Sequence, residues 1–340
     1  MLSHKAKTIL NDPRLIAERD AWFARLTSHF GRTVRNRPFR LLGRVAGWDN
    51  TTLKYTQPEL WVEHSLETLA DMIANAAPEP ADEGKFRPWC VEGWLYGVHF
   101  IDKIFGCKVY FTDDNWYNDY LPYKTGTLEM PDLDTDETWA LAKRAAIAFA
   151  ECDVKLPLFG TDVLSSTLNI AVNLSSADIL SAMLDDPDAA RHDFRIINET
   201  LKTTRRWFMD TIPAPQLQPS VSGYRTQPPG YGQLCGCTTH LLSAAQYADF
   251  IAPLDNDLLG IHPHGGMIHL CGSHARHIPA FRDMPNVKSV QLNDRAAHDL
   301  RTHYETLRDD QLIYYEPCAD MPLERALELT NGGDRLVIVG

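Results

Sequence analysis

The second half of the chain alternates between short apolar runs and amphipathic segments. This pattern predicts helices at 243–251, 275–283, 295–308 and 322–330, and strands at 265–271, 287–292, 311–316 and 335–339. Short strands that alternate with helices are typical of parallel sheets with right-handed crossovers. Because no glycine-rich phosphate loop follows any of these strands, the pattern favours a (β/α)8 TIM barrel over a doubly wound nucleotide-binding fold.

The first half of the chain has a less regular pattern. It predicts helices at 9–30, 57–77, 135–151, 178–183 and 189–209, and strands at 39–45, 108–111 and 154–159. We therefore predict a single barrel domain over residues 1–340, with 1–36 as an N-terminal helical extension. The Pro/Gly-rich stretch 212–236 contains Tyr224 and Tyr231, which favour a loop over a pocket rather than a plain linker.

Composition narrows the class of protein. The chain has 340 residues, 44% of them hydrophobic and 23% charged, as in ordinary globular proteins. A formal net charge of −12 excludes nucleic acid as an expected partner, because phosphate binding needs a basic surface. There is no apolar run of about 18 residues and no apolar signal core, which predicts a cytoplasmic protein that does not enter a membrane. Seven scattered cysteines, an odd number, do not form a disulfide framework.

Reactive side chains cluster at the ends of the predicted strands, where barrel enzymes carry their active sites. His269 and Cys271 end one strand, and residues i and i+2 of a strand point the same way, so an imidazole and a thiolate meet there. Zinc takes such mixed ligands and needs three or four. Cys318, after a later strand, or Cys237 of the Cys235-Gly236-Cys237 pair would add the third. We expect at most one cysteine of that pair to be a ligand.

Several stretches resemble one known family in the same order along the chain. These stretches are Phe105-Gly106-Cys107-Lys108-Val109, Leu158-Phe159-Gly160-Thr161-Asp162, Leu184-Asp185-Asp186-Pro187, residues 242–253, and Gly265-Gly266-Met267-Ile268-His269-Leu270-Cys271-Gly272-Ser273 followed by Ile278-Pro279, 287–290 and Asn293. Together they resemble the uroporphyrinogen decarboxylase-like superfamily over roughly residues 90–340. The resemblance implies a (β/α)8 barrel and one of two activities, tetrapyrrole decarboxylation or zinc-dependent methyl transfer.

The resemblance is greater to the zinc-dependent corrinoid methyltransferases of that superfamily. Their His-x-Cys motif with a distant Cys implies His269, Cys271 and Cys318 as zinc ligands here. One departure is that a predicted strand, 335–339, still follows Cys318, whereas the distant Cys of that branch follows the last strand. The arginine-rich N-terminal segment of the decarboxylases is missing, and 44–48 is a remnant of it at best. Decarboxylation of a tetrapyrrole needs several cationic contacts, so that activity is disfavoured.

The leading hypothesis is therefore a zinc-dependent methyltransferase that moves a methyl group between a corrinoid or small methyl donor and a thiol. Zinc would hold the thiol as a thiolate nucleophile. A corrinoid would be a cofactor or co-substrate, and a corrinoid protein a partner beside the small-molecule substrate. The expected catalytic residues are His269, Cys271 and Asp114. The expected substrate- or cofactor-binding residues are Trp48, Trp116, Tyr224, Tyr231 and Asn293, with the two tryptophans offering flat surfaces to a planar cofactor.

Two alternatives stay open at this point. A decarboxylase-like enzyme could use Asp114 or Asp162 as an acid or base on a carboxylated substrate without metal. A non-catalytic protein could bind a corrinoid or tetrapyrrole in the same barrel. The sequence also leaves the oligomeric state open, with a homodimer as one option.

Overall fold

The strands of this chain form two parallel sheets and one antiparallel hairpin. The computed structural model describes residues 1–33, 35, 37–41, 45–46, 51–76, 85–86, 88–161, 165–220 and 225–339. In the larger sheet the order is β3 (Lys85–Phe86), β1 (Phe39–Leu41), β13 (Leu336–Val339), β12 (Leu312–Tyr315), β11 (Val287–Asn293), β10 (Gly266–Cys271) and β9 (Gly232–Cys235). In the smaller sheet it is β2 (Val45–Ala46), β4 (Trp89–Glu92), β7 (Leu158–Gly160) and β8 (Leu217–Gln218). The hairpin pairs β5 (Val109–Thr112) with β6 (Asn115–Asn118).

The larger and the smaller sheet approach each other next to β9. There a single parallel bridge joins Ser165 to Cys235, the last residue of β9. Within the described residues β8 has two residues and pairs with β7 alone, so no ladder continues from β8 to β9. The parallel strand–helix alternation is confirmed, whereas a complete eight-stranded barrel is not shown.

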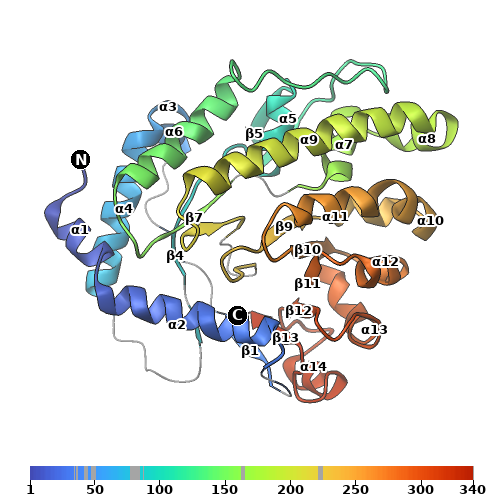
Figure 1. Cartoon of the computed structure of the whole chain (residues 1–340). Coiled ribbons are helices and arrows are strands. Elements are labelled where there is room, and N and C mark those ends of the chain that lie inside the picture. The colour runs from blue at the N-terminus through green and yellow to red at the C-terminus, as the bar shows by residue number, and fades with distance from the viewer. Residues whose placement is uncertain are drawn as a thin grey trace.

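Helices cover the outside of the sheets (Figure 1). They are α1 (His4–Leu10), α2 (Pro13–Phe30), α3 (Thr51–Thr56), α4 (Pro58–Asn75), α5 (Phe100–Ile104), α6 (Glu137–Glu151), α7 (Thr167–Ser175), α8 (Asp178–Asp185), α9 (Pro187–Thr211), α10 (Ala244–Gln246), α11 (Ala252–Gly260), α12 (Ile278–Asp283), α13 (Leu300–Thr306) and α14 (Leu323–Leu329). Side chains of Asp12, Asp136 and Asp186 cap α2, α6 and α9 by accepting from free backbone N–H groups. The helices predicted around the last four strands are all present.

Each strand separates two apolar layers. On β10 and β11, Ile268 and Val290 are fully buried against the surrounding helices. The alternate positions, such as Met267 and Tyr314, face inward and pack with Phe30 of α2 in a second cluster. This alternation follows from the period of two in a strand. The helix-facing layer holds the helices on the sheets, and the inward layer fills the space between the sheets.

Helix α2 covers the amino-terminal ends of the strands. The Phe30 ring lies 4.6 Å from the ring of Tyr231, the residue before β9. His29 donates from Nε2 to the carbonyl oxygen of Leu336, the first residue of β13, at 3.0 Å. The N-terminal stretch 1–36 therefore contains α1 and α2, and α2 closes this end. Helix α2 does not cover the carboxyl ends of the strands, which lie on the opposite side.

In the part of the chain that the structure describes, no single helix is both long and apolar enough to span a membrane. The pair α7 and α8 reaches that length and composition only together, across a bend of 108°. Much of α7 is buried in the helix-facing core, including Leu168, Ile170 and Leu174.

Candidate metal centre

A group of sulfur and nitrogen donors lies where β9 and β10 end. The two strands are parallel neighbours, and Cys235 is the cross-strand partner of His269. Paired residues of neighbouring strands face the same side of a sheet, and so does Cys271, two residues after His269. The strand register alone therefore brings these three side chains to one place.

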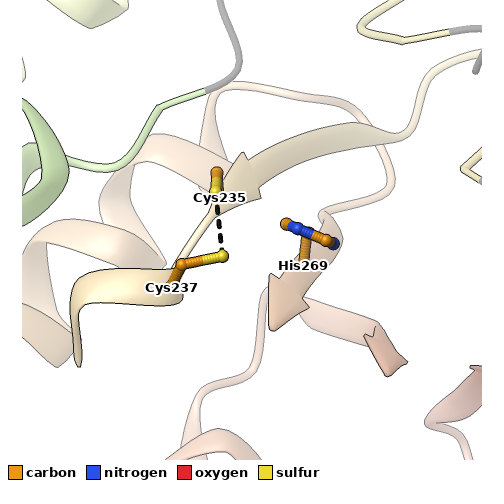
Figure 2. A group of neighbouring side chains, drawn as sticks. All are labelled: Cys235, Cys237 and His269. Atoms are coloured by element: carbon orange, nitrogen blue, oxygen red, sulfur yellow. Dashed lines mark hydrogen bonds between the residues drawn. The ribbon is translucent and has the colours of Figure 1, made fainter. Parts of the chain in front are cut away.

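Cys237 joins this group through a tight turn. Cys235 is the last residue of β9, and a short 3-10 helix, η2 (Cys237–Leu241), begins two residues later. The N–H of Gly236 donates to the carbonyl oxygen of His269 at 2.8 Å, which holds the turn against β10. The sulfur atoms of Cys235 and Cys237 are 3.3 Å apart (Figure 2). The turn brings both sulfurs to the site, whereas the sequence predicted at most one cysteine of this pair as a ligand.

Three donor atoms are close enough to share one ion, and the sulfur of Cys271 lies beside them. Sγ of Cys235, Sγ of Cys237 and a ring nitrogen of His269 all lie within 4.8 Å of one another. Sγ of Cys271 is 3.1 Å from Nε2 of His269 and also forms a hydrogen bond with Cys237. His269 is 3% exposed, so the group is shielded from bulk water on most sides.

The tautomer of His269 is set by the next strand. Gln291 of β11 is the cross-strand partner of His269, and its side-chain oxygen, Oε1, accepts a hydrogen bond from Nδ1 of the imidazole. An acceptor at Nδ1 places the ring proton there and leaves the lone pair of Nε2 facing the sulfurs. Arg225 donates from Nη2 to Nε2 at 3.2 Å, so a cation already lies beside this lone pair.

The three thiols have very different proton affinities. Hydrogen bonding with Cys237 lowers the pKa of Cys271, and His269 lowers it further. The same partner, Cys237, lowers the pKa of Cys235. Because Cys237 lies between two sulfurs that favour the thiolate, its own pKa is raised. The lowered pKa values of Cys235 and Cys271 favour the thiolate, which is the form that binds metal.

These residues fit a zinc ion. Thiolate and imidazole are the donors that zinc prefers, and structural or catalytic zinc sites use three or four of them. A metal-binding histidine usually donates its other ring N–H to a polar partner, as His269 does to Gln291. The donor set, the tautomer and the burial therefore agree with a Cys/His metal site.

Cys318 is not brought to this group. It is exposed, lies beyond the end of β12, two strands from β10, and its N–H bonds to the carbonyl oxygen of Met321 at 3.1 Å in a tight turn. Asn293, by contrast, is the cross-strand partner of Cys271 and donates from Nδ2 to its sulfur at 3.6 Å. The structure thus places Cys237 and Cys235, rather than Cys318, beside His269 and Cys271.

The remaining predicted residues lie apart from the metal group. Asp114 is exposed in the turn between β5 and β6, with a φ of 58°. Trp116 of β6 packs on Tyr96, with ring centroids 5.3 Å apart. Tyr231 lies before β9, at the end opposite Cys235, against α2. Trp48, Tyr224 and Asp162 lie outside the described residues.

Three residues of the site were missed as site residues by sequence reasoning. Cys235 was set aside because a Cys-x-Cys pair seldom binds one ion with both sulfurs. Gln291 had a usable signal, since it stands near the end of the strand that follows His269 and has the same inward parity. Arg225 had none, because it lies in an irregular segment and reaches His269 only through tertiary structure.

The fold and the site together define an α/β protein with a half-buried Cys/His cluster at the carboxyl ends of parallel strands. No protein-family model and no curated protein sequence matches this chain. Among solved structures, a methyltransferase from Methanosarcina mazei resembles it with a TM-score of 0.61 and 13% sequence identity. The match covers 92% of this chain and 90% of that one. At this identity the likeness shows a shared fold.

Proposed function

We propose that this chain is a zinc-dependent methyltransferase that transfers a methyl group from a corrinoid or a small methyl donor to a thiol. The observation that carries the proposal is the convergence of three cysteine sulfurs and Nε2 of His269 at the carboxyl ends of β9 and β10. The fold shared with a methyltransferase supports it. So does the order of motifs that resemble the zinc-dependent corrinoid methyltransferases.

Three of the four donors His269, Cys271, Cys235 and Cys237 would hold the metal, which would leave the fourth position of a tetrahedral zinc open to the acceptor thiol. When bound, zinc would act as a Lewis acid that lowers the pKa of the acceptor thiol. Gln291 fixes the imidazole so that Nε2 stays directed at the site. Sγ of Cys237 holds a proton that would leave as the metal enters, because ligating thiols must be deprotonated.

Other side chains would tune the charge of the site. The Nδ2 group of Asn293 donates to the Cys271 sulfur and so spreads its negative charge. The guanidinium of Arg225 offsets the charge of the cysteine thiolates, and its position lowers the pKa of Cys235. Burial around His269 keeps water away from the reacting sulfur, which strengthens both electrostatic effects.

The proposed reaction is a displacement at carbon. The acceptor thiol loses its proton to solvent, and its sulfur attacks the methyl carbon. A carbon–sulfur bond forms as the bond between the methyl group and the donor breaks. The bonding pair stays with the donor, so methylcobalamin would leave as cob(I)alamin.

The test combines metal analysis with turnover. Purified protein is analysed for zinc and then mixed with methylcobalamin and 2-mercaptoethanol, while the methylcobalamin absorbance and the S-methyl product are followed. We expect zinc in the wild type and loss of both zinc and turnover in Cys271→Ser. Cys318→Ser is the matched control and should keep both. Zinc-free wild type with turnover unchanged in His269→Ala would contradict the proposal. A spectral change of the corrinoid without product would instead favour a binding protein.

A further inference from the structure

Cys237 and Cys271 belong to two different loops, and strand pairing does not fix their side chains relative to each other. One runs from Cys235 through η2, and the other runs from Cys271 to the short helix η4 (Ala275–His277). Cys271 ends β10, but Cys237 lies beyond β9 and is not part of any ladder. Something other than sheet pairing must therefore fix the sulfur of Cys237 relative to that of Cys271.

His274 lies between the two loops and contacts both. Its Nε2 group donates to the carbonyl oxygen of Cys271 at 2.9 Å. On the other side of the ring, Nδ1 is 3.0 Å from the hydroxyl oxygen of Thr239, two residues after Cys237. His274 and Thr239 are both fully buried, so water does not compete for these contacts.

Neighbouring bonds make the connection stiff. The hydroxyl oxygen of Thr239 also lies 2.8 Å from the carbonyl oxygen of Gly236 in the turn that carries Cys237, and its single proton serves either this carbonyl or Nδ1 of His274. His277 donates from Nε2 to the carbonyl oxygen of Thr239 at 2.9 Å. Asn169 of α7 accepts from the N–H of Thr238 at 3.2 Å, but this contact ties the loop to α7 rather than to the loop of Cys271.

We propose that His274 and Thr239 form a clasp that sets the distance between the Cys237 and Cys271 sulfurs, with His274 as a positioning residue for the metal. This inference rests on the metal-binding part of the proposed function. Zinc–ligand bonds are about 2.0–2.3 Å long, so a small displacement of either loop would take its sulfur out of bonding distance. Partners outside the ligand shell commonly change metal affinity by about 10–100-fold when they are lost.

The experiment is a double-mutant cycle on zinc affinity. Wild type, His274→Ala, Thr239→Val and the double variant are loaded by competition against a chromophoric zinc chelator. We expect each single variant to bind zinc on the order of tenfold more weakly. The double variant should bind zinc as tightly as the single variant with the lower zinc affinity, because both changes open the same clasp. Zinc affinity within about twofold of wild type in both single variants, or losses that add in the double, would overturn the clasp.

A cobalt spectrum supplies a readout that general destabilisation would not move. The thiolate-to-cobalt absorption of the Co²⁺-loaded protein reports the number of sulfur ligands, so it should weaken in the clasp variants as Cys237 leaves. An unchanged intensity would count against the proposal. His303→Leu is the control, because His303 is another fully buried histidine and its ring nitrogens contact neither cysteine loop. If His274→Ala does not fold, His274→Gln keeps a donor toward Cys271 and still breaks the contact to Thr239.

The two proposals fail in different ways. A wild type that binds zinc tightly but never methylates a thiol would contradict the methyltransferase assignment and leave the clasp standing. A wild type that turns over while both clasp variants bind zinc normally would remove the clasp alone.

Discussion

Nδ1 of His269 donates to Oε1 of Gln291, and this one bond leaves Nε2 facing the Cys271 sulfur 3.1 Å away. The two residues are cross-strand partners on β10 and β11, so the backbone register itself supplies the contact. If the ring proton were on Nε2, the lone pair would be on Nδ1, which faces Gln291 and not the sulfurs. The orientation of the candidate ligand His269 therefore depends on Gln291, which is not itself a candidate ligand.

Replacing Gln291 by leucine should weaken zinc binding by about 10–100-fold, because the imidazole loses the partner that fixes its tautomer and orientation. Chelator competition measures the change. Gln291→Glu keeps an acceptor at the same place and should stay near the wild-type affinity. Equal affinity in the leucine and glutamate variants would show that the bond does not matter for metal binding.

Serine substitutions should separate the cysteines into two groups. Cys235→Ser and Cys237→Ser remove sulfurs that lie 3.3 Å apart beside His269, so both should lower the zinc content of purified protein. Cys318→Ser changes an exposed residue two strands away and should leave it unchanged. Elemental analysis of the three proteins decides the matter, and loss of zinc in Cys318→Ser would return that residue to the ligand set.

In the metal-free protein, the rate at which Cys271 is alkylated should depend on pH less than that of an ordinary thiol. Hydrogen bonding with Cys237 lowers the pKa of Cys271 below the usual thiol value, so its thiolate is already populated at neutral pH. Its reaction with iodoacetamide should change little between about pH 6 and 8 and fall only as the pH drops through the lowered pKa. Peptide mass spectrometry follows each site.

The matched comparisons for this pH profile lie in the same chain. Burial raises the pKa of Cys107 to about 12, and at 1% exposure it should stay unlabelled throughout. In Cys237→Ala the hydrogen bond that is the main cause of the lowered pKa is gone, so the Cys271 profile should move to higher pH. A Cys271 rate that rises about tenfold per pH unit across this range in the wild type would contradict the lowered pKa.

Phe30→Ala should destabilise the fold without touching the metal group. Phe30 packs against Tyr231 and Tyr314 at the amino-terminal ends of the strands, opposite the cysteines. Truncating a buried phenylalanine costs about 3–5 kcal/mol of unfolding free energy. Denaturant unfolding gives that value, and zinc affinity measured under folding conditions should match the wild type. A parallel loss of zinc affinity in folded protein would show that the two ends are coupled.

Much of the fold could be predicted because the signals were local. The apolar runs at 266–271, 287–293, 312–315 and 336–339 are strands, and the segments between them are helices, as their periodicity indicated. The predicted closure into an eight-stranded barrel is not shown in the same way. It would need β8, only two residues long, to pair with β9, and among the described residues β8 pairs with β7 alone.

The sequence predicted His269 and Cys271 together and named Cys237 as one of two options for a third ligand. His269 and Cys271 lie on one strand, where the period of two gives their common direction. Which cysteine joins them depends on strand neighbours and on a turn at Gly236, which are tertiary facts. Cys318 matched a family motif by its spacing, but the structure places it two strands away and in a different turn.

The candidate donors Cys235, Cys237, His269 and Cys271 lie within one strand–helix–strand unit, from β9 to the end of β10. Only two neighbouring strands have to pair before the donors are near one another, and the remote parts of the chain contribute none of them. An ion captured at that stage would favour this unit over its unpaired forms during folding, since it binds only where both strands are in register. The cluster would then stabilise the pairing of β9 with β10 early in folding, in addition to its proposed role in the reaction.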